Sequence, residues 1–189
     1  GQGIYDLDTY FAAFRIPDFI FNLLILGTVS TAFVPVFQHY VKEKNLEEGW
    51  RYANAFLNLI MVILVISSAV MYFFAPILVK LMAPGFHGDK FDITVSLSRL
   101  MLISPLIFGV SSVAQSIQNV FNRFFFYALA PIFYNLGIIF GIVYLSPGFG
   151  VYGVAYGVIL GALMHLLIQL GAVFHLGYRF QMIFDWNRH

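Results

Sequence analysis

The chain of 189 residues is 60% hydrophobic and only 10% charged, with a net charge of +1. Soluble domains are about 45–50% apolar and about 25% charged, so this balance, with a mean hydropathy of +0.84, excludes an ordinary soluble domain. The ten basic residues form no run, which argues against a nucleic-acid partner, and the absence of cysteine excludes a disulfide framework or a thiolate metal site.

Four uncharged runs are long enough to cross a bilayer, for which about 20 apolar residues suffice. The last run, residues 124–178, is long enough for two crossings and is interrupted by the sequence SPGFG at 146–150. We therefore predict an all-α integral membrane protein, a single bundle of five transmembrane helices over residues 8–39, 52–82, 93–122, 125–145 and 151–178.

Basic residues are divided unequally between the two sides of this predicted bundle. One side holds Lys42, Lys44, Arg51, Arg123, Arg179 and Arg188, and the other holds Lys80 and Lys90. Because loops rich in Lys and Arg remain in the cytoplasm, we expect the first side to be cytoplasmic and the first residue to lie outside. An outside N-terminus without a signal sequence, and an odd number of helices, favour a fragment that lacks a preceding helix.

The first predicted helix carries an organised set of polar residues. Asp8, Arg15, Asp18 and Asn22 are spaced by seven, three and four residues, which places them on one helical face. Intramembrane charges cost about 2.5–3.5 kcal/mol on insertion scales, so they normally face a bundle interior or a cavity and are paired. Asp18 is spaced to pair with Arg15. The alternative is that these residues lie in the outer headgroup zone, with Arg15 reaching outward.

The third predicted helix has a second polar stripe, formed by Ser104, Ser111, Gln115, Gln118 and Asn122. These side chains either form hydrogen bonds between helices or line a hydrophilic path. Arg99 lies near the outer end of the same helix, where it is either an interfacial residue or a ligand-binding one.

Proline and glycine residues occur within the predicted helices and at the turns between them. Prolines that bend or break them lie at Pro17, Pro35, Pro76, Pro105 and Pro131. The sequence Pro-Gly-Phe occurs at 84–86 and at 147–149, where Pro84-Gly85 and Pro147-Gly148 predict two type II turns; an internal repeat is the alternative. Gly153, Gly157 and Gly161 recur every four residues, a spacing that favours close helix packing within the bundle over dimerisation. His165 and Gln169 have no acidic or cysteine partner at ligand spacing, so we expect no metal site. No catalytic or cofactor-binding constellation appears, which argues against an enzyme.

The ordered motifs GQGIYDLDTYFAAFRIPDF, AFVPVF, LMAPGF, RLMLISP, QNVFNRF and APIFYNLGII resemble the MurJ (MviN) family. These are lipid II flippases of the multidrug/oligosaccharidyl-lipid/polysaccharide exporter superfamily. The resemblance spans essentially the whole chain, from the second to the sixth transmembrane helix, and so implies part of the N-lobe of a two-lobed, fourteen-helix transporter of the bacterial inner membrane. It implies alternating access, driven by membrane potential or a coupled ion, that carries an undecaprenyl-pyrophosphate-linked precursor outward. The implied partners are this lipid-linked precursor, membrane lipids and the remainder of the transporter, including its first helix and second lobe.

The resemblance also suggests site residues and shows departures. Asp8, Arg15, Asn122 and Arg123 match family positions, whereas Phe21, Asn22 and Leu26 replace an arginine pair and an acidic residue that usually precede the glycine at Gly27. The candidate substrate-binding residues are Arg15, Asp8, Asp18, Asn22, Gln115 and Arg99. The candidate structural residues are Pro17, Gly27, Pro35, Pro84, Gly85, Asn122, Arg123, Pro131, Gly153 and Gly157. The lost arginines keep two alternatives open: an exporter of another polyprenyl-linked glycan or a small solute, and a non-transporting scaffold of cell-wall machinery.

Overall fold

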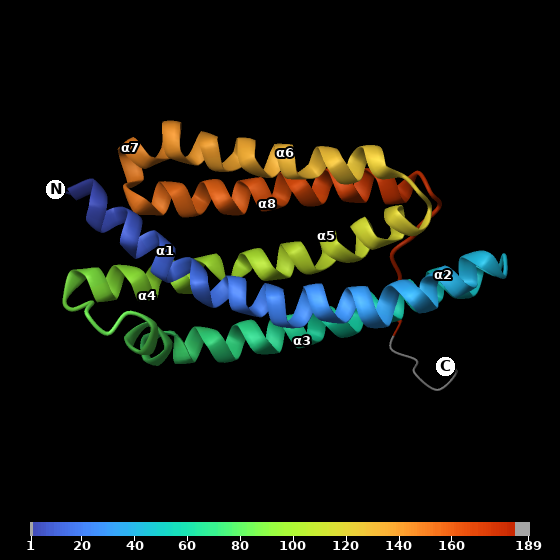
Figure 1. Ribbon diagram of the computed structural model, residues 1–189, viewed down its shortest axis with the longest axis horizontal. Helices are drawn as coiled ribbons and strands as arrows, with labels where there is room; N and C mark the ends of the chain where they lie inside the picture. The colour runs from blue at the N-terminus through green and yellow to red at the C-terminus, as the bar shows by residue number, and fades with distance from the viewer. Residues whose placement is uncertain (1, 184–189) are drawn as a thin grey trace.

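The computed structural model describes residues 2–183, with the side chains of residues 7–25 and 27–183. Five helical spans in this part are long and apolar enough to cross a membrane: Leu7–Lys42, Leu46–Met82, Asp89–Val120, Phe124–Phe149 and Val151–Phe174. They lie alongside one another in an elongated bundle (Figure 1). No strand occurs among the described residues. The predicted all-α bundle with five membrane-spanning helices is confirmed.

Several spans contain more than one helical element. The first consists of α1 (Gln2–Ile20), η1 (Phe21–Leu26), η2 (Val29–Phe33) and α2 (Val34–Lys42). The second is α3 (Leu46–Met82), and the third consists of α4 (Asp89–Met101) and α5 (Ile103–Val120). The fourth consists of α6 (Phe124–Phe140), η3 (Gly141–Leu145) and α7 (Ser146–Phe149), and the fifth is α8 (Val151–Phe174).

The loop between the first span and α3 is short. Lys44 adopts a positive φ of 57°, and the Asn45 side chain caps α3 by accepting a hydrogen bond from the Glu48 backbone N–H at 3.4 Å. Glu47 and Glu48 lie in the first turn, where the helix dipole favours carboxylates. The charged sequence VKEKNLEEGWR is therefore mostly helical, and α3 begins at Leu46, before the predicted start at 52, because Asn45 provides a favourable N-cap.

The two Pro-Gly-Phe sequences do not form the predicted type II turns. Residues 83–86 close a turn through the Phe86 N–H and the Ala83 carbonyl at 3.0 Å, but Gly85 lacks the positive φ that a type II turn requires. The second sequence forms the helical turn α7, because proline is well suited to the first turn of a helix. Positive φ angles occur instead at Gly88 (54°) and Gly150 (58°), directly before α4 and α8.

The first span contains two π-helical segments, η1 and η2, a feature that is rare and is found frequently at functional sites. Gly27 lies between them in a right-handed helical conformation, with open space around it, and Pro35 lies in the first turn of α2. Side chains bond to carbonyls of this irregular stretch: Thr31 Oγ1 donates to the Gly27 carbonyl at 2.7 Å and Tyr52 OH to the Ala32 carbonyl at 3.0 Å. These bonds help the span remain continuous through its π segments.

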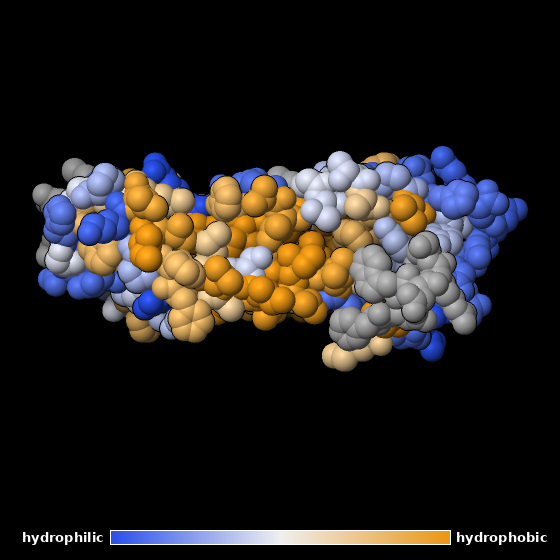
Figure 2. Space-filling view, turned by 90° about the horizontal axis from the view of Figure 1, so that it is seen from below, coloured by the Kyte–Doolittle hydropathy of each residue, from blue (hydrophilic) through white to orange (hydrophobic). Residues whose placement is uncertain are grey.

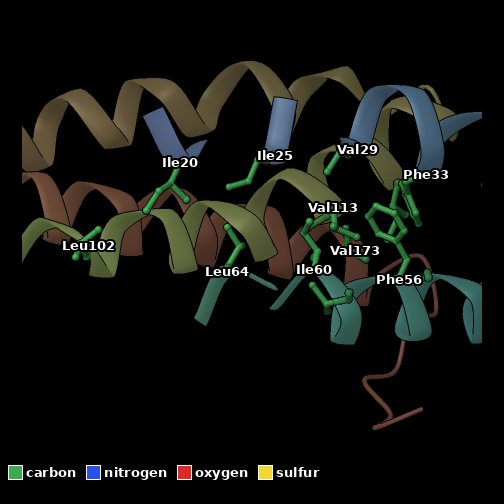
Figure 3. Close-up of a cluster of buried hydrophobic side chains, with 14 of the residues drawn as sticks. Ile20, Ile25, Val29, Phe33, Phe56, Ile60, Leu64, Leu102, Val113 and Val173 are labelled. Carbon is green, nitrogen blue, oxygen red and sulfur yellow. The ribbon is translucent and has the colours of Figure 1, made fainter. Parts of the chain in front are cut away.

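A cluster of buried apolar side chains joins the first span to α3, α5 and α8 (Figure 3). Its members include Ile20, Ile25, Val29, Phe33, Phe56, Ile60, Leu64, Leu102, Val113 and Val173. At Gly109 of α5 an added Cβ would lie 2.3 Å from Leu64 Cδ1, so α3 packs directly on this glycine. Close packing of this kind holds membrane helices together, since burial from lipid gives little hydrophobic driving force.

α6 and η3 pack against α8 through glycines on both sides, and Figure 1 shows these helices side by side. An added Cβ at Gly157 would lie 2.6 Å from Gly141 Cα, and one at Gly153 would lie 2.4 Å from the Leu145 carbonyl carbon. Both glycines therefore pack against backbone within the same bundle.

α8 ends at Phe174, before the predicted limit at 178, and Gly177 with a φ of 93° turns the chain away. Residues 178–183 then run along α3 and are held by Asn54 and Asn58. Asn54 Oδ1 accepts hydrogen bonds from Tyr178 OH at 2.8 Å and from the Gln181 backbone N–H at 2.9 Å. Burial raises the pKa of Tyr178 to about 12, so its hydroxyl remains a donor at neutral pH.

The amide nitrogens of these two asparagines complete the attachment. Asn54 Nδ2 donates to the Arg179 carbonyl at 3.0 Å. Asn58 Nδ2 donates to the Gln181 and Ile183 carbonyls at 3.1 and 3.0 Å. We call this set of bonds the asparagine clamp. It ties the segment that follows α8 to α3.

The surface matches a membrane environment. Figure 2 shows a broad band of apolar side chains across the middle of the molecule and hydrophilic residues at both ends. Phe73, Leu81, Phe125 and Tyr144 are between 70% and 74% exposed, which is favourable only against lipid or another apolar partner. Together with the five spans, this surface identifies a multi-pass membrane protein.

The charged residues follow the predicted division between the two ends. Lys42, Lys44, Arg51, Arg123 and Arg179 lie at the end of the bundle where α2, α5 and α8 finish, and Lys80 and Lys90 lie at the opposite end (Figure 1). Arg188 lies outside the described residues. Asn122, with a φ of 58°, forms the turn between α5 and α6 and allows the Arg123 N–H to bond to the Gln118 carbonyl at 2.8 Å.

Candidate functional site

A cavity of about 320 Å³, which we call the inner cavity, lies between the first span, α5 and the start of α6. Its polar lining consists of Ser30, Ser112, Gln115, Ser116, Asn119 and Tyr127. All six belong to membrane-spanning helices. Polar side chains at this depth normally face a bundle interior or a water-filled cavity, so this interface is a candidate hydrophilic path.

A second cavity, of about 290 Å³, lies farther along the same interface. Pro17 of α1, Pro105 of α5 and Pro131 of α6 all line it, and we call it the proline cavity. Its other lining residues are the aromatic Phe14, Phe21 and Phe108 and the polar Asp18, Ser104, Tyr134 and His165. Proline interrupts the backbone hydrogen bonding of each helix, which a membrane tolerates where the freed groups find other partners. The two cavities share no described lining residue, and we refer to the pair as the polar groove.

Asp18 carries the carboxylate that lines this groove. It lies eleven residues after Leu7, the start of the first span. At about 1.5 Å per residue this is about 16 Å from that end of a span of 36 residues, so Asp18 lies in the first half of the span. Of the four polar residues that the sequence places on one face of the first span, all among the described residues, Asp18 alone lines either cavity.

Arg15 differs from this prediction. It is exposed, lines neither cavity of the groove and makes no ion pair with Asp18. Three residues turn a helix by about 300°, so the two side chains leave α1 in directions about 60° apart, and only Asp18 reaches the cavity. Asp8 instead pairs with Lys90, with 3.5 Å between Oδ2 and Nζ. Asn22 Nδ2 donates to the Asp18 carbonyl of its own helix at 2.9 Å.

The polar stripe of α5 is divided between hydrogen bonds to another helix and the lining of the groove. Ser104 and Gln115 line the groove. Ser111 Oγ lies 2.6 Å from His165 Nδ1 of α8, and Gln118 Nε2 donates to the Gln169 carbonyl at 3.2 Å and also to its side-chain oxygen. The stripe therefore packs on α8 along one edge and faces the groove along the other.

Most polar residues of the groove are not among the predicted site residues: Ser30, Ser104, Ser112, Ser116, Asn119, Tyr127, Tyr134 and His165. His165 is buried, and Phe108 packs edge-on against its ring. The spacing of four residues between His165 and Gln169 shows from the sequence that both lie on one face of α8. It does not show which helix that face contacts. Among the described residues no group of three or more His, Cys, Asp or Glu side chains is close enough to share a metal ion.

Arg99, a predicted substrate-binding residue, lies away from the groove. Its Nε donates to the Tyr72 carbonyl at 3.0 Å, and its guanidinium lies 4.7 Å from the centre of the Tyr72 ring. In an unbroken helix the Tyr72 carbonyl would accept from residue 76, which is Pro76 and has no N–H. Arg99 therefore satisfies a carbonyl that this proline leaves free, and joins α4 to α3.

This geometry predicts a non-additive pair of substitutions. Arg99→Ala should lower the free energy of unfolding by about 1–3 kcal/mol, because the Tyr72 carbonyl loses its donor. In a Pro76→Ala background the restored N–H of residue 76 can bond to that carbonyl, so Arg99→Ala should cost clearly less. Thermal unfolding of the full-length parent protein with both single variants and the double variant measures the coupling. Simple additivity of the two effects would contradict the assignment.

Comparisons with known proteins agree with this arrangement. The sequence profile of the family described as lipid II flippase MurJ matches residues 3–189. The chain is 32% identical over 184 residues to a probable lipid II flippase MurJ of Buchnera aphidicola subsp. Acyrthosiphon pisum, covering 95% of this chain and 36% of that protein. It is 32% identical over 166 residues to a lipid II flippase MurJ of Thermosipho africanus, covering 85% of this chain and 33% of that protein.

A solved structure agrees as well. It is described as lipid II flippase MurJ in an inward closed conformation, and it aligns with a TM-score of 0.78 at 25% identity over 95% of this chain and 38% of that chain. The chain thus spans about a third of the length of the relatives that it matches. From the profile match over almost all of its residues, the chain belongs to the lipid II flippase MurJ family.

Proposed function

We propose that the chain is part of the N-lobe of a flippase that moves lipid II, an undecaprenyl-pyrophosphate-linked peptidoglycan precursor, across the bacterial inner membrane. The precursor moves from the cytoplasmic to the outer leaflet by alternating access. The end of the bundle that carries Lys42, Lys44, Arg51 and Arg123 faces the cytoplasm. The remainder of the same transporter supplies a first helix and a second lobe.

The observation that carries this proposal is the polar groove. A flippase has to shield a polar headgroup from hydrocarbon while the lipid tails remain in the membrane. The groove supports that task because it places Gln115, Asn119 and Asp18 among packed helices at membrane depth, while the outer faces of α3 and α6 are apolar. Binding between packed helices near the midplane is general in transporters of this kind.

One observation favours a second candidate function, the export of another polyprenyl-linked glycan. Phe21 and Asn22 occupy the places where the resemblance implies an arginine pair. Arginine suits bidentate phosphate recognition, and Asn22 instead bonds to its own helix. Binding of the cargo by this chain therefore depends less on cationic contacts from the first span than it would with the implied arginine pair.

Complementation of a cell depleted of its MurJ tests the proposal. The full-length parent gene is expected to restore growth, and Gln115→Leu is expected to weaken rescue by about tenfold or more, since it removes a polar group from the inner cavity. Arg15→Ala in the same assay tests whether that exposed cation also contacts the cargo. The matched control is Asn135→Leu, because Asn135 is exposed and bonds only to the carbonyl of Pro131 in its own helix.

Failure of a well-expressed parent to rescue would contradict lipid II as the cargo and favour the other glycan or a scaffold. Equal rescue by the parent and by Gln115→Leu would remove the inner cavity from the transport path.

A further inference from the structure

We propose that the proline cavity binds a monovalent cation, with the carboxylate of Asp18 as its charged ligand. The binding site follows from the residues that line the cavity.

Asp18 is the acidic residue of the proline cavity, and the described lining places no cationic side chain beside it. Among the described residues no lysine or arginine lines the cavity, and Arg15 of the same helix neither lines it nor pairs with Asp18. The other lining side chains are aromatic rings, prolines and neutral polar groups. A carboxylate within a membrane-spanning segment favours a positively charged partner.

Ser104 provides an independent sign of a ligand. Its side chain is 3% exposed, it lines the cavity, and its Oγ has no hydrogen-bond partner among the described residues. Buried hydroxyl groups are almost always bonded, so an orphaned one beside a cavity indicates an unfilled polar interaction. A hydroxyl oxygen is also a suitable ligand for a hard cation.

The remaining polar groups come from α6 and α8. Tyr134 offers a phenolic oxygen, and His165 has Nδ1 engaged by Ser111, which leaves Nε2 as its free ring nitrogen. Asp18, Tyr134 and His165 are therefore the titratable groups that line the cavity, while α5 contributes only Ser104 among its polar residues. The volume of about 290 Å³ accommodates a cation with several waters, each of which takes about 30 Å³ in the liquid.

Direct binding measurements on the purified full-length parent protein test the site. Radioactive sodium is the first probe, in choline buffer and without lipid cargo. Saturable binding is expected for the parent, and Asp18→Asn should weaken it by about tenfold or more because the charged ligand is lost. Ser104→Ala should weaken it less. Asp89→Asn, at an exposed carboxylate in the first turn of α4, is the matched control and should bind as the parent does.

Proton uptake is the second probe, since a proton could occupy the same carboxylate. If sodium does not bind, acidification of the sodium-free parent should produce proton uptake that Asp18→Asn removes. Equal sodium binding or proton uptake by the parent and Asp18→Asn would overturn the proposal, as would the absence of both in the parent. Because no lipid cargo is present, this result is independent of complementation, so a protein that binds the cation but does not rescue contradicts only the proposed cargo.

Discussion

Substitution of Gly157 by leucine is expected to prevent stable folding of the five-span bundle. A Cβ at this position would lie 2.6 Å from Gly141 Cα and 2.9 Å from the Gly137 carbonyl oxygen. Both are backbone atoms, so no rotamer change can relieve the contact, and α6 and η3 would have to move away from α8. We expect a loss of about 3 kcal/mol or more, at the upper end of the cost of overpacking.

Gly171→Leu is the matched control, because Gly171 lies on the same helix with nothing within 4 Å of an added Cβ. The thermal unfolding midpoint and the monodisperse yield of the full-length parent protein in detergent would report the difference. Equal midpoints for the two leucine variants would show that the close contact of α6 with α8 is not required.

These glycines illustrate what the sequence can predict. The spacing of Gly153 and Gly157 indicates a packing face, and the long uncharged runs indicate five spans, because both signals are local and periodic. The same GxxxG spacing at Gly137 and Gly141 identifies the opposite face of the contact, although it was not used in the prediction. Which two glycine faces meet depends on the tertiary arrangement.

Errors in the predicted element boundaries arose where one residue determines a helix end. The start of α3 depends on the Asn45 cap, and the end of α8 depends on Gly177. Composition favoured a loop over the charged residues before Arg51, whereas capping and the helix dipole stabilise a helix there.

The candidate site was predicted in part. Periodicity places Asp18 and Gln115 on faces turned toward the bundle, and the structure puts both in the polar groove. Arg15 shares that periodicity but lies outside the groove, because its side chain leaves α1 about 60° away from that of Asp18. The other polar residues that line the proline cavity come from α5, α6 and α8, and sequence spacing within one helix carries no information about them.

The asparagine clamp is the second feature for which we expect a large effect. Asn54→Leu should release residues 178–183 from α3, because the change removes the acceptor of the Tyr178 hydroxyl and the Gln181 N–H and the donor to the Arg179 carbonyl. The loss of several buried hydrogen bonds should cost about 3 kcal/mol locally. Exchange of the Gln181 amide hydrogen should then accelerate by about a hundredfold, since 1.4 kcal/mol corresponds to a factor of ten.

Hydrogen exchange of the full-length parent protein, followed by mass spectrometry of peptides that cover this segment, measures the effect. Asn135→Leu is a suitable control, because Asn135 bonds only to its own helix and should leave the segment protected. If Asn54→Leu leaves the exchange of Gln181 unchanged, the apolar contacts of Tyr178 must hold the segment instead. If exchange accelerates as expected, the asparagine clamp on α3 determines the path of the chain after α8. A movement of α3 during transport would then also move this segment.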